Sequence, residues 1–330
     1  MENGASQSLR APFAFITNTN SNYSIKWKKE NLFLEKKIRN EAKNLEDKRK
    51  MPIFASSEST LLGMIFYFSG TGNTRWVASE IAKAINEELF YIPDLIREER
   101  SEFTLHEGER IGFCFPTHGW QVPRIVREFI KRLKMNTKDH YCWALTTCGD
   151  DMGETMTILN RDLAANELLA SNSVPLQADT TFSVIMPESY VCLPFMKTDP
   201  EEKEKWKIEN ARRQLQHIIP IIKDCKRGIE ELDKGATPRL YSYVIGEYFN
   251  KRMVTDKKFT VDKDVCTHCG KCAKVCPVDN IKGAPPEWIH NGRCTSCLAC
   301  YHYCPVHAIN FGKITRKRDQ YYFNRRGDQR

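Results

Sequence analysis

The sequence lacks a hydrophobic run long enough to cross a membrane. Its longest near-apolar stretch runs from Leu61 to Phe68, whereas a spanning helix needs about 20 apolar residues. It also lacks the composition of a disordered polyelectrolyte, since 41% of its 330 residues are hydrophobic and 28% are charged. The N-terminus shows no apolar core of the kind that signal peptides carry. We therefore expect a cytoplasmic protein that binds no membrane.

A basic domain is missing as well, although the net charge is +8. Residues 1–63 carry +4 and residues 313–330 carry +5, which leaves −1 for residues 64–312. Because the excess lies only at the ends, we expect no nucleic-acid binding. The fingerprint GxGxxG is also absent, which disfavours direct oxidation of a nicotinamide cofactor.

The two basic ends have less informative patterns. Residues 1–62 show no sustained periodicity, so we expect a disordered or partly helical extension, and translation could begin at Met64 instead. Residues 313–330 form a basic C-terminal tail with interleaved aromatic residues. A solvated tail is the default expectation, and binding of an acidic redox partner or RNA is the alternative.

A regular alternation begins at Gly63, where short apolar runs, polar turns and amphipathic stretches follow one another. This pattern predicts an α/β fold built from βαβ units, with any ligand beyond the carboxyl ends of parallel strands. The expected strands are Met64–Phe68, Leu89–Ile92, Ile111–Phe115, Tyr141–Thr146 and Phe182–Met186. The expected helices cover 77–85, 122–133, 154–169 and 200–223, the last kinked at Pro220.

The first expected strand runs into Ser69-Gly70-Thr71-Gly72-Asn73-Thr74, directly before a helix. Glycines let the backbone curl around an oxyanion, and the helix N-terminus directs its amides at it. The hydroxyls of Ser69, Thr71 and Thr74 and the side-chain amide of Asn73 could bind the same anion. Because the loop has no lysine and no Walker spacing, it favours a phosphate held by neutral donors. A simple Ser/Gly-rich turn is the alternative.

Two further loops follow expected strands, namely Pro116-Thr117-His118-Gly119-Trp120-Gln121 and Thr147-Cys148-Gly149-Asp150-Asp151-Met152-Gly153. Trp120 could stack on a flat cofactor or cap the sheet edge. His118 could tune a cofactor, donate a proton or merely orient its loop. We expect a structural role for Cys148.

These three loops resemble those of the flavodoxin family, from residue 64 to about residue 223. The resemblance implies a doubly wound parallel sheet of strand order 2-1-3-4-5. It also implies FMN, with the phosphate at Ser69–Thr74 and the isoalloxazine between the Pro116–Gln121 and Thr147–Gly153 loops. The chain departs from the family in lacking marked acidity and an aromatic residue in the third loop.

Of the 13 cysteines, eight lie between Cys266 and Cys304. They form two runs with an offset of 28 residues, Cys266-x2-Cys269-x2-Cys272-x3-Cys276-Pro277 and Cys294-x2-Cys297-x2-Cys300-x3-Cys304-Pro305. Clustered cysteines in a reducing compartment favour metal over disulfides. A doubled run of four cysteines followed by proline is not typical of zinc sites. It is the pattern that binds two [4Fe–4S] clusters.

Residues 259–312 resemble the bacterial two-cluster ferredoxins, which implies a small α+β domain. By position, one cluster would take Cys266, Cys269, Cys272 and Cys304, and the other Cys294, Cys297, Cys300 and Cys276. Small residues such as Gly270 and Ala299 fit tight loops around inorganic sulfur.

The whole chain resembles flavodoxin–ferredoxin fusion proteins. The expected parts are the extension 1–62, a flavodoxin-like domain 63–235, a connector 236–258 with a possible helix at 240–249, the ferredoxin domain 259–312 and the tail 313–330. We expect electrons to pass between the clusters and FMN and on to redox partner proteins, with no catalytic residue. One alternative is an FMN-dependent reductase of a small substrate, using His118 or Tyr190. Another is a ferredoxin whose flavodoxin-like domain has lost FMN and docks a partner.

Overall fold

The computed structural model describes residues 63–170 and 174–327. The extension expected at 1–62 lies outside these residues. The structure therefore does not test whether translation begins at Met64. Within the described ranges, no helix has the length and apolarity that crossing a membrane requires.

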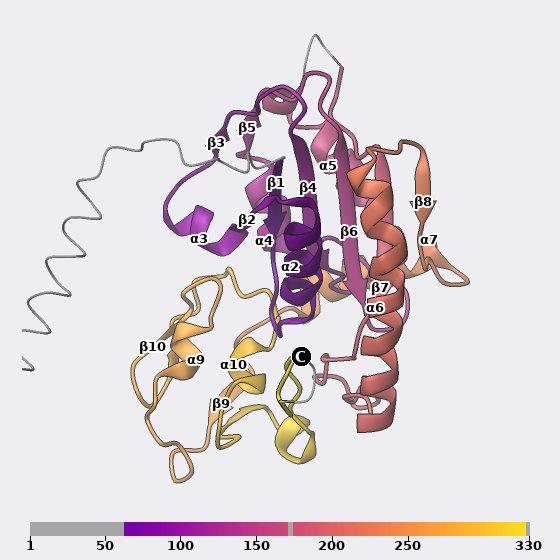
Figure 1. Cartoon of the computed structure of the whole chain (residues 1–330). Helices are drawn as coiled ribbons and strands as arrows, with labels where there is room; N and C mark the ends of the chain where they lie inside the picture. Colours follow the sequence, from indigo (N-terminus) through magenta and orange to yellow (C-terminus); the bar gives the residue numbers. More distant parts are fainter. Residues whose placement is uncertain (1–62, 171–173, 328–330) are drawn as a thin grey trace, which may run out of the picture. The chain divides into compact units, whose positions relative to one another are not determined.

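The centre of the fold is a six-stranded parallel sheet (Figure 1). Its strands are β1 (Gly63–Tyr67), β2 (Glu88–Tyr91), β4 (Arg110–Pro116), β6 (Cys142–Cys148), β7 (Thr180–Ile185) and β8 (Ile229–Glu231). The spatial order β2-β1-β4-β6-β7-β8 confirms the predicted order 2-1-3-4-5 and adds one edge strand, β8. The inner strands read as apolar runs because both of their faces are covered. Two short strands, β3 (Glu102–Phe103) and β5 (Lys134–Met135), pair separately.

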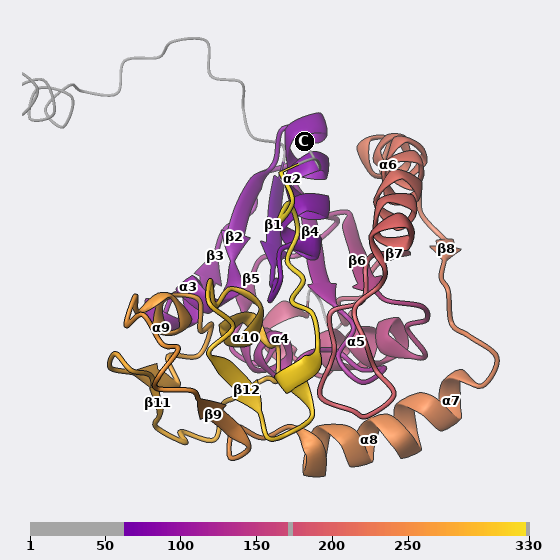
Figure 2. The same ribbon diagram turned by 90° about the horizontal axis from the view of Figure 1, so that it is seen from below.

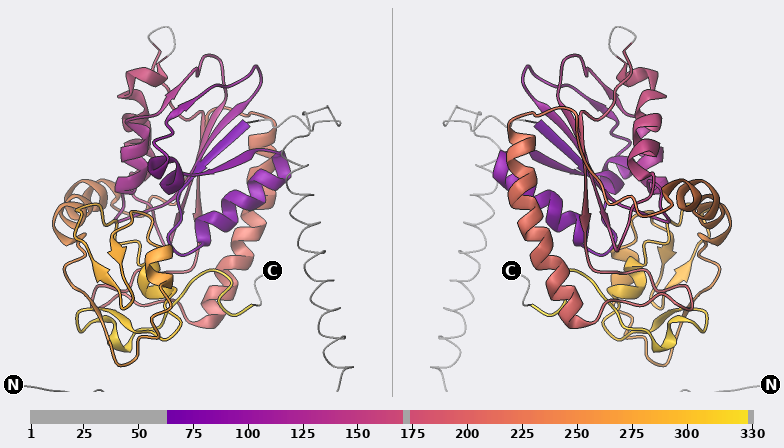
Figure 3. Two further views of the ribbon diagram at one scale, coloured as in Figure 1. Left: turned by 90° about the vertical axis from the view of Figure 1, so that its left-hand side faces the viewer. Right: turned by 90° about the vertical axis from the view of Figure 1, so that its right-hand side faces the viewer.

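Helices cover both faces of this sheet (Figure 3). On one face, α2 (Asn73–Ile85) and α6 (Glu201–Lys223) enclose an apolar core with the sheet. The other face carries α3 (Ile92–Arg97), α4 (Arg124–Ile130), α5 (Thr155–Ala164) and the turn η1 (Glu167–Leu169). The predicted kink at Pro220 does not end α6, which continues to Lys223. Because the strands are parallel, this arrangement gathers the loops that follow β1, β4 and β6 at one edge of the sheet.

The aromatic connector is helical, as the sequence indicated. It consists of α7 (Pro238–Leu240), η2 (Tyr241–Ile245), α8 (Gly246–Tyr248) and η3 (Phe249–Met253), one helical segment in Figure 2. The Gln121 amide donates hydrogen bonds to the Ser242 carbonyl and the Glu247 carboxylate. The connector therefore packs directly on the loop that follows β4.

The cysteine-rich segment is built from two similar halves. Its elements are β9 (Phe259–Val261), α9 (Lys271–Lys274), β10 (Ile281–Lys282), β11 (Glu287–Trp288), α10 (Ala299–His302), β12 (Ile309–Phe311) and η4 (Thr315–Lys317). Strands β9 and β12 pair antiparallel, as do β10 and β11. The two short helices begin 28 residues apart, which matches the offset of the cysteine runs.

Among the tail residues that the structure describes, the default expectation of a solvated tail holds for the exposed basic side chains at 313, 316, 317, 325 and 326 but is wrong for the segment around Gln320 and Tyr321. Residues 318–327, here called the C-terminal strap, run back along the molecule towards α2 (Figure 2). Gln320 and Tyr321 are buried, and Phe323 stacks on Trp76 of α2 with 5.0 Å between ring centroids. The many basic residues of this segment gave no indication of such packing in the sequence. One of them forms an ion pair with α6, because the Arg326 guanidinium lies 3.1 Å from the Glu201 carboxylate.

Candidate functional site

The eight clustered cysteines surround two cavities. One cavity is lined by Cys266, Cys269, Cys272 and Cys304, and the other by Cys276, Cys294, Cys297 and Cys300. These are the two sets that the ferredoxin resemblance implies, each with one cysteine from the opposite run. Each cavity is lined by four cysteines, so both suit the same group.

A cluster also explains the spacing of these thiols. In the described part of the chain, no three His, Cys, Asp or Glu side chains converge closely enough to hold one metal ion. Four cysteines of a [4Fe–4S] cluster each bind a different iron and therefore stand farther apart than the ligands of a single ion. The donor set fits two cubanes better than two zinc ions.

The two cysteine runs repeat the same unusual backbone. Gly270 and Leu298, at equivalent positions, both adopt the left-handed conformation, with φ of 67° and 59°. Ala299, the small residue expected in the second loop, directly follows the left-handed Leu298. The fourth cysteines also match, because the Asn280 amide donates to Cys276 Sγ at 3.3 Å and the Ala308 amide to Cys304 Sγ at 3.2 Å. Such N–H donors stabilise thiolates and tune cluster potentials.

The two cavities differ in their surroundings. Cys269 in the first is exposed, and a hydrogen bond from the Lys271 backbone lowers the pKa of its thiol. Cys297, at the equivalent position of the second, is half-buried, and burial raises the pKa of its thiol to about 11. We call the first the outer cavity and the second the inner cavity. At this ligand position the outer cavity is the more exposed of the two.

The loop Ser69–Thr74 lies between β1 and α2, as predicted. Gly72 precedes the helix with φ of 99°, a conformation that favours glycine. Its amide donates to Ser69 Oγ at 3.1 Å, and Thr74 Oγ1 lies 2.7 Å from Thr147 Oγ1. The first backbone amides of α2 have no acceptor within the helix. Together with the buried hydroxyl of Thr71, these groups fit a phosphate.

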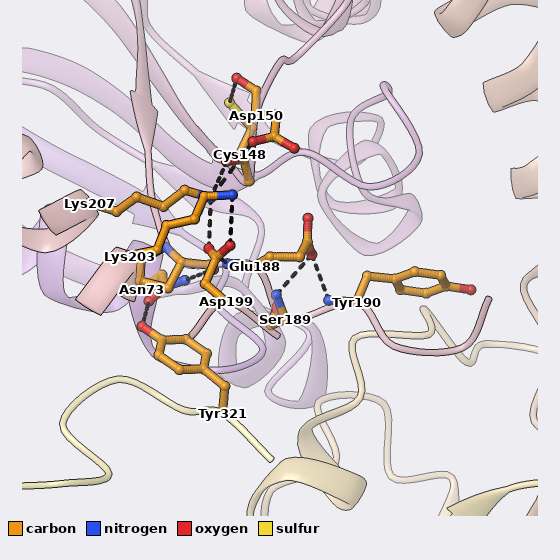
Figure 4. Close-up of polar contacts among 12 residues, drawn as sticks. Asn73, Cys148, Asp150, Glu188, Ser189, Tyr190, Asp199, Lys203, Lys207 and Tyr321 are labelled. Carbon is orange, nitrogen blue, oxygen red and sulfur yellow. Dashed lines mark hydrogen bonds and ion pairs between the residues drawn. The ribbon is translucent and has the colours of Figure 1, made fainter. Parts of the chain in front are cut away.

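The structure corrects the predicted role of the Asn73 side chain. Its Nδ2 donates to the Pro187 carbonyl at 3.0 Å, and its Oδ1 accepts from the Tyr321 hydroxyl at 2.6 Å. Both ends of the amide group are therefore engaged by protein (Figure 4). Asn73 contributes its backbone amide to the loop, while its side chain fixes the loop to two other segments.

The loop Ser69–Thr74, here called the phosphate loop after its expected ligand, packs against a cysteine of the inner cavity. A Cβ on Gly70 would lie 2.9 Å from both the Cβ and the backbone oxygen of Cys297. The glycine therefore provides space for the cysteine run as well as for backbone curvature. No sequence pattern had indicated this contact between the two segments.

The loop after β4 is held mainly by protein contacts. Pro116 ends the strand, and Thr117 Oγ1 lies 2.9 Å from Thr146 Oγ1. Trp120 packs against Tyr241 at 4.7 Å between ring centroids, and its indole N–H donates to Asp151. This contact with the connector is closer to the capping role than to cofactor stacking. A Cβ on Gly119 would lie 2.4 Å from the Phe249 ring, so this glycine accommodates the connector.

His118 is enclosed at the contact between the two domains. Its ring meets Phe68 edge to face and forms a hydrogen bond with the Thr295 backbone in the second cysteine run. Burial lowers the pKa of His118 to about 4. The ring is therefore neutral at pH 7, which removes it as an imidazolium proton donor and supports the orienting role.

Two charged residues near the third loop were missed. Lys207 of α6 is 2% exposed and donates to the Gly149 carbonyl at 2.6 Å, and its Nζ lies 2.7 Å from the Asp199 carboxylate. Glu188 accepts hydrogen bonds from the Ser189 and Tyr190 backbone amides (Figure 4). A lysine in a charged amphipathic helix gives no signal of burial, because its partners are distant in sequence.

Gly149 and Cys148 fill structural positions in that third loop. A Cβ on Gly149 would lie 2.2 Å from a Glu188 carboxylate oxygen, so the glycine makes room for the acid. Cys148 is buried, and burial raises the pKa of its thiol. This environment agrees with the structural role expected for Cys148.

Comparisons with known proteins define the class. A flavodoxin domain model matches residues 64–176, and a 4Fe-4S binding domain model matches residues 259–282 and 287–310. The chain therefore joins a flavodoxin-like domain to a 4Fe–4S domain with two motifs, the organisation of flavodoxin–ferredoxin fusion proteins. This pairing supports a redox or electron-transfer role.

The other comparisons add little. The search of curated proteins found no match. Among solved structures, a proposed flavoprotein from Bacteroides uniformis ATCC 8492 is similar, with 19% identity and a TM-score of 0.24. The match covers 30% of this chain and 81% of that one.

Proposed function

We propose that this protein carries electrons between external redox partners through two [4Fe–4S] clusters and an FMN. The main supporting observation is the contact of Gly70 in the phosphate loop with Cys297, which lines the inner cavity. The exposure of Cys269 supports the outer cavity as the point where external partners exchange electrons. The proposed order of transfer is therefore outer cavity, inner cavity and FMN.

The FMN assignment is supported by the donors of the loop. Ser69, Thr71 and the Thr74–Thr147 pair would hold the phosphate with the first amides of α2. When bound, FMN can exchange one or two electrons, whereas each cluster exchanges one. No lysine or arginine is required, because helix amides and hydroxyls are neutral donors.

Two observations bear on the alternatives. The ring of His118, which is neutral at pH 7, and the phenol of Tyr190, whose pKa burial raises, do not favour a reductase that protonates a substrate. The connector packing on Gly119 and Trp120 does favour a docking domain without FMN. The experiment below separates this candidate from electron transfer through FMN.

Anaerobically reconstituted protein should bind about eight irons and about one FMN per chain. After a pulse of a one-electron reductant, cluster bleaching should be followed by flavin bleaching. Cys297→Ser should abolish the second phase, because it removes an inner-cavity ligand. Cys269→Ser should preserve that phase when a small reductant is used, and should slow reduction by a protein donor.

Cys225→Ser is the matched control, because this cysteine lies outside both cavities. Absence of flavin from protein that holds its full iron content would overturn the FMN part and leave the docking domain. Flavin bleaching at the wild-type rate in Cys297→Ser would refute the proposed order.

A further inference from the structure

The C-terminal strap crosses the phosphate loop. The Phe323 amide donates to the Thr71 carbonyl at 2.8 Å, and the Tyr321 hydroxyl donates to Asn73 Oδ1 at 2.6 Å. Tyr321 is 3% exposed, so this bond is shielded from water. Figure 4 shows the Tyr321 ring directed at Asn73. Two positions of the loop, Thr71 and Asn73, are thus bound by residues far away in sequence.

The same strap is anchored on the second cysteine run. Gln320 Nε2 donates to the carbonyls of Tyr301 and Cys304, at 2.6 and 2.8 Å. The Tyr321 amide donates to His302 Nδ1 at 3.0 Å. These bonds attach the beginning of the strap to α10 and to Cys304. The strap is therefore bound to the second cysteine run as well as to the phosphate loop.

Little space separates the strap from the loop. A Cβ on Gly72 would lie 3.0 Å from the Phe323 Cβ and 3.4 Å from the Tyr303 hydroxyl. The Asn73 side chain has only one orientation that serves both Tyr321 and the Pro187 carbonyl. Because Asn73 begins α2, this orientation also sets the position of the amides that face an anion.

We propose that Tyr321 is a positioning residue of the phosphate loop and that the strap favours retention of FMN by fixing the conformation of this loop. This inference rests on the proposed function. Tyr321 acts through Asn73, and Phe323 acts through Trp76 and the Thr71 carbonyl.

The test measures FMN binding by recovery of flavin fluorescence in the reconstituted full-length protein. Tyr321→Phe should raise the Kd for FMN about fivefold, which corresponds to the free energy that one buried hydrogen bond contributes. Phe323→Ala should raise it further, through a faster dissociation rate. Tyr141→Phe is the control, because it removes a buried tyrosine hydroxyl bond to Lys226, far from the loop.

A second measurement does not depend on flavin. Amide hydrogen exchange of residues 69–76 should accelerate in Tyr321→Phe and stay unchanged in Tyr141→Phe, with equal iron content in both. Unchanged exchange and unchanged Kd in Tyr321→Phe would overturn the inference. If wild-type protein binds no FMN, the proposed function and the retention role fall, while exchange still decides whether Tyr321 positions the loop.

Discussion

Gly70 and Cys297 lie so close that a methyl group on the glycine would sit 2.9 Å from the cysteine backbone oxygen. They belong to two domains, one in the loop after β1 and the other in the second cysteine run. A single added carbon atom on Gly70 would therefore force the phosphate loop and Cys297 apart.

Gly70→Ala should therefore destabilise the protein by about 1–3 kcal/mol, the usual cost of overpacking. Backbone atoms form part of the obstacle, so a side-chain rotation cannot relieve it. Anaerobic urea unfolding measures the loss, with the exposed Lys83→Ala on α2 as the control. Equal midpoints for both variants would show that the two domains separate easily.

Lys207 and Lys203 both reach the Asp199 carboxylate but differ in exposure, at 2% and 51%. Lys207→Met should cost about 3–5 kcal/mol, because it leaves the largely buried carboxylate without its main partner. Lys203→Met should cost less than about 1 kcal/mol. Denaturant unfolding of the two variants provides the comparison, and a similar small loss in both would contradict the importance of burial.

The left-handed positions of the two cysteine runs offer a matched pair. Gly270→Ala should cost about 1 kcal/mol from strain alone, since no atom lies within 4 Å of the added Cβ. Leu298→Gly should relieve similar strain but lose a buried leucine side chain, for a net loss of about 1–2 kcal/mol. Unfolding under anaerobic conditions tests both, and a stabilised Leu298→Gly would show that backbone strain dominates.

The pKa of His118, about 4 in the folded protein against 6.5 for the free side chain, makes stability depend on pH. Below pH 6.5 the unfolded chain binds a proton that the folded chain excludes, so stability falls as the pH drops towards 4. From pH 7 to pH 5 this residue should account for a loss of about 2 kcal/mol.

His118→Asn should remove that part of the pH dependence while wild type retains it. Unfolding free energies of both proteins at pH 7 and pH 5 give the difference, in which the contributions of all other groups cancel. Parallel losses in the two proteins would mean that His118 titrates normally.

The sheet could be predicted because its four inner strands, β1, β4, β6 and β7, are largely buried on both faces. The edge strand β8 escaped prediction, since Ile229 is followed by two glutamates and the strand is largely exposed. The cysteine sets could be predicted from spacing, because the two runs carry the same pattern of ligands and proline.

Contacts between distant segments could not be predicted in the same way. The strap reads as a basic tail, and nothing local indicates that Tyr321 meets Asn73. The glycines at 119 and 149 read as features of flavin loops, yet they make room for Phe249 and Glu188. Periodicity reports which face of an element is apolar, whereas these contacts depend on which other segment covers it.

The bond between Asn73 and Tyr321 joins positions 248 residues apart. Ribosomes add about 5–20 residues per second, so about 12–50 s separate the synthesis of the loop from that of the strap. The loop is therefore complete well before Tyr321 is made. Vectorial synthesis means that α2 and its preceding loop form without the bond that fixes Asn73 in the finished chain.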